Sequence, residues 1–570
     1  MDKQKVADVL NELSILLELK GENPFKIRAY QNGARIIERL DGDLKKMVED
    51  GSIGKLKGIG KGLAEVIEEL VKTGSLLYFN ELKEEFPETL FELLDVPGLG
   101  PKRVKTLYNN LGITSIGELE YACMENRLID LPGFGKKMQE NILKGVENLK
   151  SYREKSLYPE SFATAMNILD RIKGHPDVLD ADIAGSLRRH KEIIGDIDIV
   201  VAADKGEGIM DLFTELEDVL DIIGKGDTKS AVRLKNGMTA DLRVVSPKEF
   251  PYAMNHFTGS KEHNTKMRHI AKKNGLKMNE YGVFNVETGE LIPCESERDI
   301  YNIFNMDYIP PELREDMGEI EAAKKGNLPK LIATKDIKGV MHVHSVYSDG
   351  LNTIKELADH ARELGYSYIG ISDHSKSAYY ANGLKEDDVK AQIEEIDRLN
   401  EEYTDFKILK GIESDILPDG SLDYDEDILS LFDFIIASVH SGFTMSRDDM
   451  TERILRAMDS PYVSILGHLT GRLLLSREGY DVDIEKIIEK AARENVAIEI
   501  NANPYRLDLD WRWCKLAKDR GTKLVICPDA HDLENFDYID LGVKIARKGW
   551  LSREDVLNCS DVWKLDRGGN

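Results

Sequence analysis

The chain has 570 residues, 41% hydrophobic and 32% charged, which is typical of a soluble globular protein with about three to five domains. Its formal net charge of −26 disfavours a simple basic nucleic-acid binder, so local amides and short basic stretches would have to grip any polyanion, and salt should weaken that binding. No apolar run reaches the roughly 18 residues of a membrane span, no leader segment is visible and the five cysteines form no CxxC pair, which together predict a cytoplasmic protein.

The first 150 residues favour short helices and repeat one theme three times: an apolar residue, a G-x-G turn and the start of a helix. The copies lie at 57–70, 96–112 and 131–146. Glycine permits the tight turn, and the free amides at the start of the helix can meet a phosphate. The repeats predict contact with a nucleic-acid backbone without sequence readout; the alternative is a helical bundle with glycine corners. The glycines concerned are Gly58, Gly60, Gly98, Gly100, Gly133 and Gly135.

Two carboxylates lie on one face of a predicted strand further along the chain. Asp196 and Asp198 alternate with apolar residues, and side chains two apart in a strand share a face. A third carboxylate, Asp241, belongs to another strand-forming run. Carboxylates this close repel unless a cation lies between them, and hard divalent ions take carboxylate oxygens while keeping positions open for phosphate. The pattern predicts a two-metal site, although a D-x-D pair by itself is more often solvated surface.

The segment around these carboxylates alternates helix and strand, with predicted helices at 160–174 and 209–223, a strand at 178–186 and a hairpin at 231–245. Because a Gly-Ser turn and two arginines precede the carboxylates, the stretch GSLRRHKEIIGDIDIVV resembles the nucleotidyltransferase signature of DNA polymerase family X. The resemblance implies that Gly185, Ser186 and Arg189 hold an incoming triphosphate. It also implies catalytic binding of two Mg²⁺ or Mn²⁺ ions by Asp196, Asp198 and Asp241.

The run NHFTGSKEHNTKMRHIA resembles the thumb segment of the same family, whose tight turn packs against the nucleotide sugar. By that resemblance Phe257 and Gly259 shape the sugar pocket, Asn264 faces the base and Arg268 lies near the template strand. His256 stands where relatives often have tyrosine, which leaves the strength of ribose exclusion open.

The three G-x-G copies resemble the helix-hairpin-helix motif of these polymerases. Relatives that remove a 5′-deoxyribose phosphate carry a lysine nucleophile in the helix after the first hairpin. Gly62 and Val66 occupy the aligned positions here, so no Schiff base can form by that route. Lyase activity is therefore expected to be absent or to use another lysine.

From Lys338 onward the chain repeats an apolar strand, a ligand-rich strand end and a helix, seven times. This order predicts a parallel β/α barrel, whose active site lies at the C-terminal ends of its strands. A single histidine at a strand end is more often structural, but a whole set of metal-competent residues at successive ends indicates a metal centre. The candidate ligands are His342, His344, Asp349, His374, Glu413, His440, His468, Asp529 and His531.

This set resembles the polymerase and histidinol phosphatase (PHP) domain with a trinuclear site. The resemblance implies one ion held by His342, His344, Glu413 and Asp529, a second by Glu413, His440 and His468, and a third by Asp349, His374 and His531. Mixed nitrogen and oxygen ligands suit Zn²⁺ or Mn²⁺, which can activate water against a phosphate ester.

Taken together, the sequence predicts a multidomain fold: all-α helix-hairpin-helix domains, an α+β nucleotidyltransferase palm and thumb, and a seven-stranded β/α PHP barrel. The predicted function is a monomeric family X DNA polymerase that fills short gaps in repair, acting on gapped or primer-template DNA and deoxynucleoside triphosphates, with a 3′→5′ exonuclease in the barrel. Incision at abasic sites stays open. The alternatives are a small-molecule phosphatase with a degenerate polymerase module, and a non-enzymatic scaffold that binds DNA ends. The predicted domains are 1–88, 89–150, 151–245, 246–317, a linker at 318–337, and 338–570.

Overall fold

The computed structural model describes residues 3–38, 40, 44–49, 51–56, 59–129, 131–150 and 155–561. The chain divides into two compact units, Met1–Leu149 and Lys150–Asn570. Within the described ranges, no helix combines the length and the apolar character that a membrane crossing requires.

The described residues of the first unit form helices joined by short turns, and they have two hydrophobic cores. One core gathers Leu10, Leu13 and Ile67, and the other gathers Val104 and Ile142. The elements of the first core are α1 (Lys3–Lys20), α2 (Pro24–Glu38), α3 (Leu44–Glu49), η1 (Ile53–Lys55), α4 (Lys61–Thr73) and α5 (Leu77–Glu84), and those of the second are η2 (Glu88–Asp95), α6 (Pro101–Leu111), α7 (Ile116–Met124) and α8 (Lys136–Lys150).

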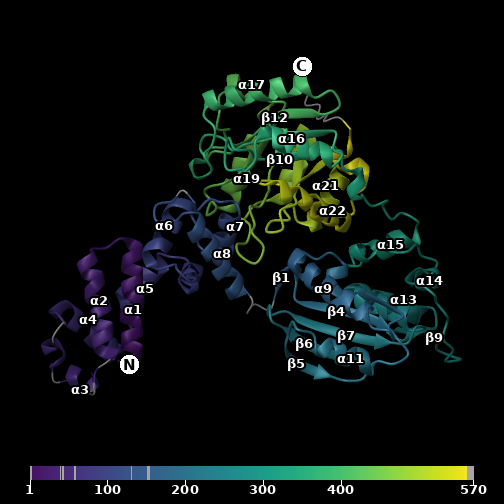
Figure 1. Cartoon of the computed structure of the whole chain (residues 1–570), viewed down its shortest axis with the longest axis horizontal. Helices are drawn as coiled ribbons and strands as arrows, with labels where there is room; N and C mark the ends of the chain where they lie inside the picture. The colour runs from purple at the N-terminus through teal and green to yellow at the C-terminus, as the bar shows by residue number, and fades with distance from the viewer. Residues whose placement is uncertain are drawn as a thin grey trace. The chain divides into compact units, whose positions relative to one another are not determined.

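The second unit begins with a five-stranded sheet in the order β2-β4-β7-β6-β5, in which only β4 and β7 run parallel (Figure 1). Two short strands, β1 (Ser156–Leu157) and β3 (Ile193–Ile194), pair beside it. The elements of this palm are α9 (Tyr158–Lys173), β2 (Asp180–Ile183), α10 (Gly185–Arg188), β4 (Asp196–Ala202), α11 (Glu207–Thr214), β5 (Val219–Lys225), β6 (Lys229–Leu234) and β7 (Thr239–Val245).

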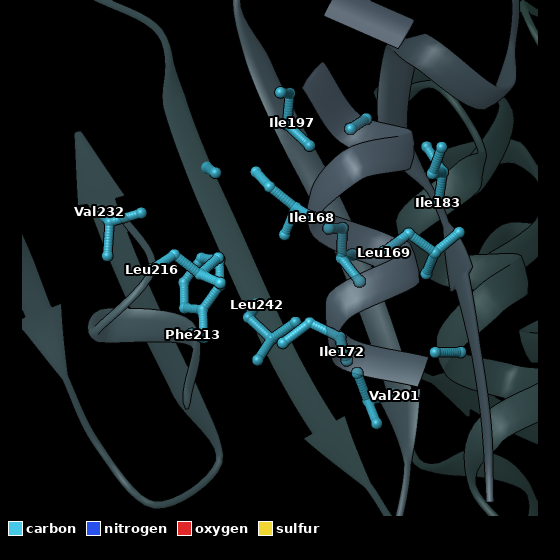
Figure 2. Packing of buried hydrophobic residues seen from close by; sticks show 14 of the residues in the cluster. Ile168, Leu169, Ile172, Ile183, Ile197, Val201, Phe213, Leu216, Val232 and Leu242 are labelled. Atoms are coloured by element: carbon cyan, nitrogen blue, oxygen red, sulfur yellow. The ribbon is translucent and has the colours of Figure 1, made fainter. Parts of the chain in front are cut away.

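One face of the palm sheet is covered by α9 and α11. Ile197 and Ile199 of β4 are buried on this side, whereas Asp196 is exposed and Asp198 half-buried, as the alternation in the sequence predicts. Each fully buried aliphatic or aromatic side chain contributes roughly 1.5–3 kcal/mol, so this face fixes which way the carboxylates point. Figure 2 shows the meeting of helix residues Ile168, Leu169, Ile172 and Phe213 with strand residues Val201, Val232 and Leu242.

The helix predicted at 209–223 was wrong beyond Thr214. The chain turns after α11 and forms β5, which pairs antiparallel with β6 at the edge of the sheet. The segment contains β-branched Val219, Ile222 and Ile223, which lose side-chain freedom in a helix and fit an extended strand well. The pairing partner lies further along the chain, so the local pattern could not distinguish the two states.

The thumb follows the palm and is completed by a residue from the far end of the chain. Its buried core contains Tyr252, Met267, Tyr301 and Ile309 together with Trp550, which is only 7% exposed. The segment predicted as a linker contains buried Ile332. The elements are α12 (Phe250–Thr258), α13 (Lys261–Lys273), β8 (Leu276–Asn279), β9 (Gly282–Asn285), α14 (Glu297–Ile303), η3 (Pro311–Leu313), α15 (Glu319–Lys324) and η4 (Thr334–Asp336).

The barrel prediction is confirmed: seven parallel strands lie in the order of the sequence, with helices around them (Figure 1). A bridge between Val343 and Ala530 brings the first and last strand ends together, so the barrel is nearly closed. The strands are β10 (Gly339–Val343), β11 (Tyr368–Ile371), β12 (Lys407–Asp415), β13 (Phe434–Ser438), β14 (Ile465–Leu466), β15 (Ala497–Asn501) and β16 (Leu524–Cys527).

Helices connect these strands, as the alternation in the sequence predicts. They are α16 (Ile354–Glu363), η5 (Tyr379–Ala381), α17 (Glu386–Glu402), α18 (Glu426–Leu429), α19 (Arg447–Ala457), α20 (Ile484–Glu494), α21 (Trp511–Arg520), η6 (Leu533–Asp537), α22 (Tyr538–Lys548), η7 (Arg553–Asp555) and η8 (Leu557–Cys559).

The last two long barrel helices contact the palm and the thumb. Glu192 of the palm accepts hydrogen bonds from the Trp511 indole at 3.1 Å and from Arg512 at 3.0 Å. Arg547 of α22 pairs with Glu312, which lies in η3 of the thumb. The barrel therefore contacts the palm and thumb through partly shielded polar pairs and, at Trp550, through an apolar side chain.

Candidate functional sites

The palm carboxylates lie side by side on adjacent strands. Asp198 of β4 and Asp241 of β7 are direct partners in the parallel register, and Asp196 is two residues earlier on the same face of β4. The sheet thus brings together all three predicted catalytic residues. Asp241 follows Asp198 by 43 positions, and a helix and two strands lie between them in the sequence.

The charges of this cluster indicate a missing positive counterpart. Burial, Asp196 and Asp241 together raise the pKa of Asp198 to about 7. Lys229 of β6 places its ammonium 2.8 Å from Asp241 and offsets part of the negative charge. A divalent cation would relieve the remaining repulsion, so the three carboxylates fit the Mg²⁺ or Mn²⁺ that the sequence predicts.

The Gly-Ser turn lies against the carboxylates. Gly185 has a φ of +62°, and a Cβ at this position would come within 2.2 Å of an Asp198 carboxylate oxygen, so only glycine fits. Ser186 follows it in α10. Arg189 ends this turn; its Nε donates to Glu315 at 2.9 Å and one Nη donates to the carbonyl of Thr258 at 2.9 Å. Gly185 therefore lies directly against Asp198, whereas the guanidinium of Arg189 is held by Glu315 and the Thr258 carbonyl.

The predicted nucleotide-contact residues of the thumb surround one turn. Asn264 donates to the carbonyls of His256 and Gly259, at 2.6 and 3.2 Å, and a Cβ on Gly259 would collide with its amide. The guanidinium of Arg243 lies 4.3 Å from the centre of the Phe257 ring. In this structure Asn264 therefore holds the turn, while Arg268 is exposed on α13.

The nine predicted barrel ligands converge at the C-terminal ends of the strands. Side-chain nitrogen and oxygen atoms of eight of them form three groups, each within 4.8 Å. Salt-bridge distances connect His468 to Glu413 and place it beside the same cluster. The three groups are His344, Asp349, His374 and His531; His342, His344 and Asp529; and His374, Glu413 and His440.

Glu413 lies at the centre of the barrel cluster. Its Oε1 is 3.0 Å from His468 and 3.4 Å from both His342 and His440, while its Oε2 is 2.9 Å from His374. A carboxylate with imidazoles near both oxygens suits the bridging role that the family resemblance implies for Glu413.

The unsatisfied atoms of the cluster fit a metal centre. Both ring nitrogens of His344 and of His374 and Nε2 of His342 are buried without a hydrogen-bond partner among the described residues. Leaving such groups unpaired costs about 1–3 kcal/mol each, which bound cations would recover. Burial, together with neighbouring imidazoles, lowers the pKa of His344 to about 4, so its ring is neutral and able to bind a metal. The donor set fits Zn²⁺ or Mn²⁺.

Two carboxylates that the sequence interpretation missed support these ligands. Glu499 of β15 accepts from His342 Nδ1 at 2.5 Å and from the His468 amide at 2.5 Å, and it is fully buried. Asp415 is 2.6 Å from Nδ1 of His440. A signal was present in the run VAIEINAN, where a charged residue interrupts a strand that is otherwise apolar. Such partners orient a ligating imidazole and fix its tautomer.

The glycine hairpins of the first unit present open helix starts. Gly60 precedes α4 and Gly100 precedes α6, each as the N-cap in extended backbone without a side-chain cap. A Cβ at either position, or at Gly133 or Gly135, would meet nothing within 4 Å, so a phosphate can approach the amides. Gly58 lies outside the described residues.

The arrangement of hairpins, palm, thumb and metal-competent barrel defines a DNA polymerase module joined to a PHP domain, and comparison with known families agrees. Four family models match: the helix-hairpin-helix domain at 1–76, the SAM-like helix-hairpin-helix tandem at 90–148, the DNA polymerase beta thumb at 253–315 and the PHP domain at 341–503.

Curated relatives cover the whole chain or the barrel alone. The chain is 40% identical to the DNA polymerase/3′-5′ exonuclease PolX of Bacillus subtilis (strain 168) over 564 residues, which is 99% of this chain and 98% of the relative. Probable phosphatases of Thermoanaerobacter sp. (strain X514) and Clostridium acetobutylicum are each 29% identical over 241 residues, 39% of this chain and 91% and 90% of theirs. The chain belongs to the family X DNA polymerases that carry a C-terminal PHP domain.

Proposed function

We propose that this protein is a DNA polymerase that fills short gaps during base excision repair and related DNA repair, and that its PHP barrel is a 3′→5′ exonuclease. The observation that carries the proposal is the presence, in one chain, of three juxtaposed palm carboxylates and nine converging barrel ligands. The B. subtilis relative, whose name contains both activities, supports it.

In the palm, Asp196 and Asp198 would hold both of two Mg²⁺ or Mn²⁺ ions and Asp241 the one nearer the primer end. Bound metal would supply charge stabilisation for the attacking and leaving oxygens. Gly185 lets the backbone of the triphosphate-binding turn lie against the Asp198 carboxylate, because a side chain there would collide with it. Ser186 and Arg189 receive phosphate oxygens, and Asp241 accepts the proton of the primer 3′-hydroxyl.

The thumb would position the nucleotide and the template. Phe257 and Gly259 line the sugar pocket. Asn264 stabilises this turn by donating to the carbonyls of His256 and Gly259, and it faces the base of the nucleotide. Exposed Arg268 is available to the template strand. His256 lies edge-on to Phe257, with ring centres 5.0 Å apart, so the strength of ribose exclusion depends on this pair.

In the barrel, up to three Zn²⁺ or Mn²⁺ ions would polarise the phosphodiester and activate water. The family resemblance assigns each ion its own ligands apart from a bridging Glu413. The grouping of the side chains instead lets His344 and His374 each belong to two groups, so these two histidines are also candidates to lie between ions. Asp415 would orient the imidazole of His440, and Glu499 would orient that of His342. The same centre would suit incision at abasic sites as an alternative substrate.

The protein would act as a monomer in the cytoplasm, where its five unpaired thiols, all in described parts of the chain, suit a reducing environment. Glycine hairpins grip gapped or primer-template DNA through backbone amides, and deoxynucleoside triphosphates are the second substrate. A small-molecule phosphatase is the second candidate, favoured by the likeness of the barrel alone to probable phosphatases. The complete palm carboxylate set disfavours it.

A labelled primer-template, incubated with Mn²⁺ in the presence and absence of nucleotides, tests the proposal. We expect Asp198→Ala to abolish extension and leave degradation intact, and Glu413→Ala to do the reverse and to lower the bound metal by more than one ion per chain. His360→Gln is the matched control, because this histidine lies outside the cluster and contacts Phe536. Extension by Asp198→Ala at the wild-type rate, or normal degradation by Glu413→Ala with three ions retained, would contradict the assignments.

A further inference from the structure

A buried lysine of α22 contacts Arg189, the palm residue that is predicted to bind the triphosphate. The Lys548 side chain is fully buried, although it is the final residue of α22. Its ammonium donates to Glu315 at 2.5 Å and to the backbone carbonyl of Arg189 at 2.9 Å. The Trp511 ring covers it, with its centre 4.4 Å from the ammonium.

Glu315 connects this lysine to the Arg189 side chain. The same carboxylate oxygen, Oε1, receives the Lys548 ammonium and Nε of Arg189. Arg189 is therefore held from both ends: its carbonyl by Lys548 directly, and its guanidinium by Glu315. The described contacts of the guanidinium use two of its five donors, so others can face a ligand.

The buried ammonium of Lys548 needs both Glu315 and the Arg189 carbonyl as partners. Burial lowers the pKa of Lys548 to about 8, and Glu315 opposes that fall, so the ammonium is charged at neutral pH. A buried charge persists only when it is paired and hydrogen-bonded. Apolar residues could fill a purely structural contact between two domains, whereas this one places a costly cation against the backbone carbonyls of Arg189, at 2.9 Å, and Glu312, at 3.4 Å.

We propose that Lys548 of the barrel is a positioning residue for the polymerase site: through Glu315 and the carbonyl of Arg189 it fixes the arginine that receives the triphosphate of the incoming nucleotide. The inference rests on the proposed role of Arg189. It makes the barrel part of the nucleotide site, because the nearer of the two ammonium groups at Glu315 comes from α22, while that of Lys191 in the palm lies 3.7 Å from the other carboxylate oxygen.

The test uses the full-length protein with Lys548→Met, which removes the ammonium and keeps the length of the side chain. The KM for nucleotide should rise by about tenfold, similarly for all four bases, because the loss of one charge-assisted contact to phosphate is of that order. The exonuclease rate should stay unchanged, since the described contacts of Lys548 include no barrel ligand. Lys548→Arg should restore much of the KM.

Two variants serve as controls. Lys544→Met removes an ammonium one turn earlier on α22, which pairs with Asp540 and lies over the palm ring of Tyr158, and it should leave the KM unchanged. Arg189→Gln measures how much the contact between Arg189 and the triphosphate contributes to the KM for nucleotide. An unchanged KM in this variant would refute the triphosphate role of Arg189, and the proposed function would be wrong on that point.

A raised KM in Arg189→Gln with an unchanged KM in Lys548→Met would overturn only the positioning role. An equal rise in Lys544→Met would also overturn it, because the effect would then belong to the interface in general. If Lys548→Met loses both activities through misfolding, Glu315→Asp decides: its shorter carboxylate cannot serve both cations, so an unchanged KM contradicts the proposal and a raised KM supports it.

Discussion

Histidine alone does not define the barrel centre, because two buried carboxylates set how the imidazoles are presented. Glu499 contacts the ring of His342 and the backbone of His468, so one side chain restrains two candidate ligands from behind. An imidazole whose Nδ1 is held by a carboxylate presents Nε2 to the metal and is a stronger donor. The precision of the centre therefore depends on residues that would bind no metal themselves.

Glu499→Gln should weaken metal binding by about 10–100-fold without removing a ligand, because the amide is a poorer acceptor for the imidazole. Metal content measured by elemental analysis after dialysis against a graded chelator series checks this, and excess Mn²⁺ should restore the exonuclease. Glu485→Gln makes the same chemical change on exposed α20 and should behave as wild type. Retention of metal equal to that of wild type across the chelator series would show that Glu499 has no such role.

The two glycines of the hairpin before α6 have different roles, one in backbone conformation and one in access to the helix amides. Gly98 has a φ of +92°, so any side chain there strains the backbone, whereas Gly100 adopts an extended conformation open to all residues. A glycine at the second position is therefore not required for folding. Its value lies in the open space before the first amides of α6, which a side chain would fill.

Gly100→Val should leave the fold intact and weaken binding to gapped DNA by about five- to tenfold, the worth of roughly one hydrogen bond to phosphate. The loss should be similar for unrelated sequences, because backbone amides do not read bases. Fluorescence anisotropy at fixed salt measures it, and Gly224→Val in β5 is the control, since a Cβ there also meets open space. An effect confined to one DNA sequence would argue against backbone recognition.

Local sequence predicted the barrel well because each strand, its ligand-bearing end and the helix that follows it are contiguous. The same local logic failed at Val219–Lys225, where pairing with β6 outweighed a helical-looking pattern. Glu499 and Lys548 were out of reach for a different reason. Their partners, His342 and Arg189, are far away in sequence, and only the folded chain shows that each buried charge has a defined counterpart.

The palm and the barrel share a titratable contact. His190 follows Arg189 and is half-buried. Loss of solvent lowers its pKa to about 4, Glu312 opposes this fall, and Lys544 and Lys548 of α22 favour the neutral ring. Its environment is thus assembled from both domains. Protonation would place a further cation beside the α22 lysines, and Glu312 would offset only part of its cost.

Acidification should therefore destabilise the contact. The unfolded chain binds a proton on His190 below about pH 6.5 and the folded chain only near pH 4, so stability present at neutral pH falls in this window by at most about 3 kcal/mol. Urea unfolding of the full chain at several pH values, followed by tryptophan fluorescence, measures the fall. His190→Asn, which tolerates the left-handed backbone, should show a shallower dependence. Parallel pH profiles for the two proteins would exclude His190 as the source.

The Trp550 ring in the thumb core has a consequence for how the molecule is made. A chain leaves the ribosome from its N-terminus, and domains generally fold as they emerge. The thumb would be translated long before Trp550, so its core stays unfinished, with apolar surface exposed, until the end of the barrel has been synthesised and has docked. A truncated message would yield a thumb with an empty place of aromatic size, a lesion that typically costs about 3–5 kcal/mol. Incomplete copies would thus be removed by proteases and would not compete for DNA as polymerases without an exonuclease.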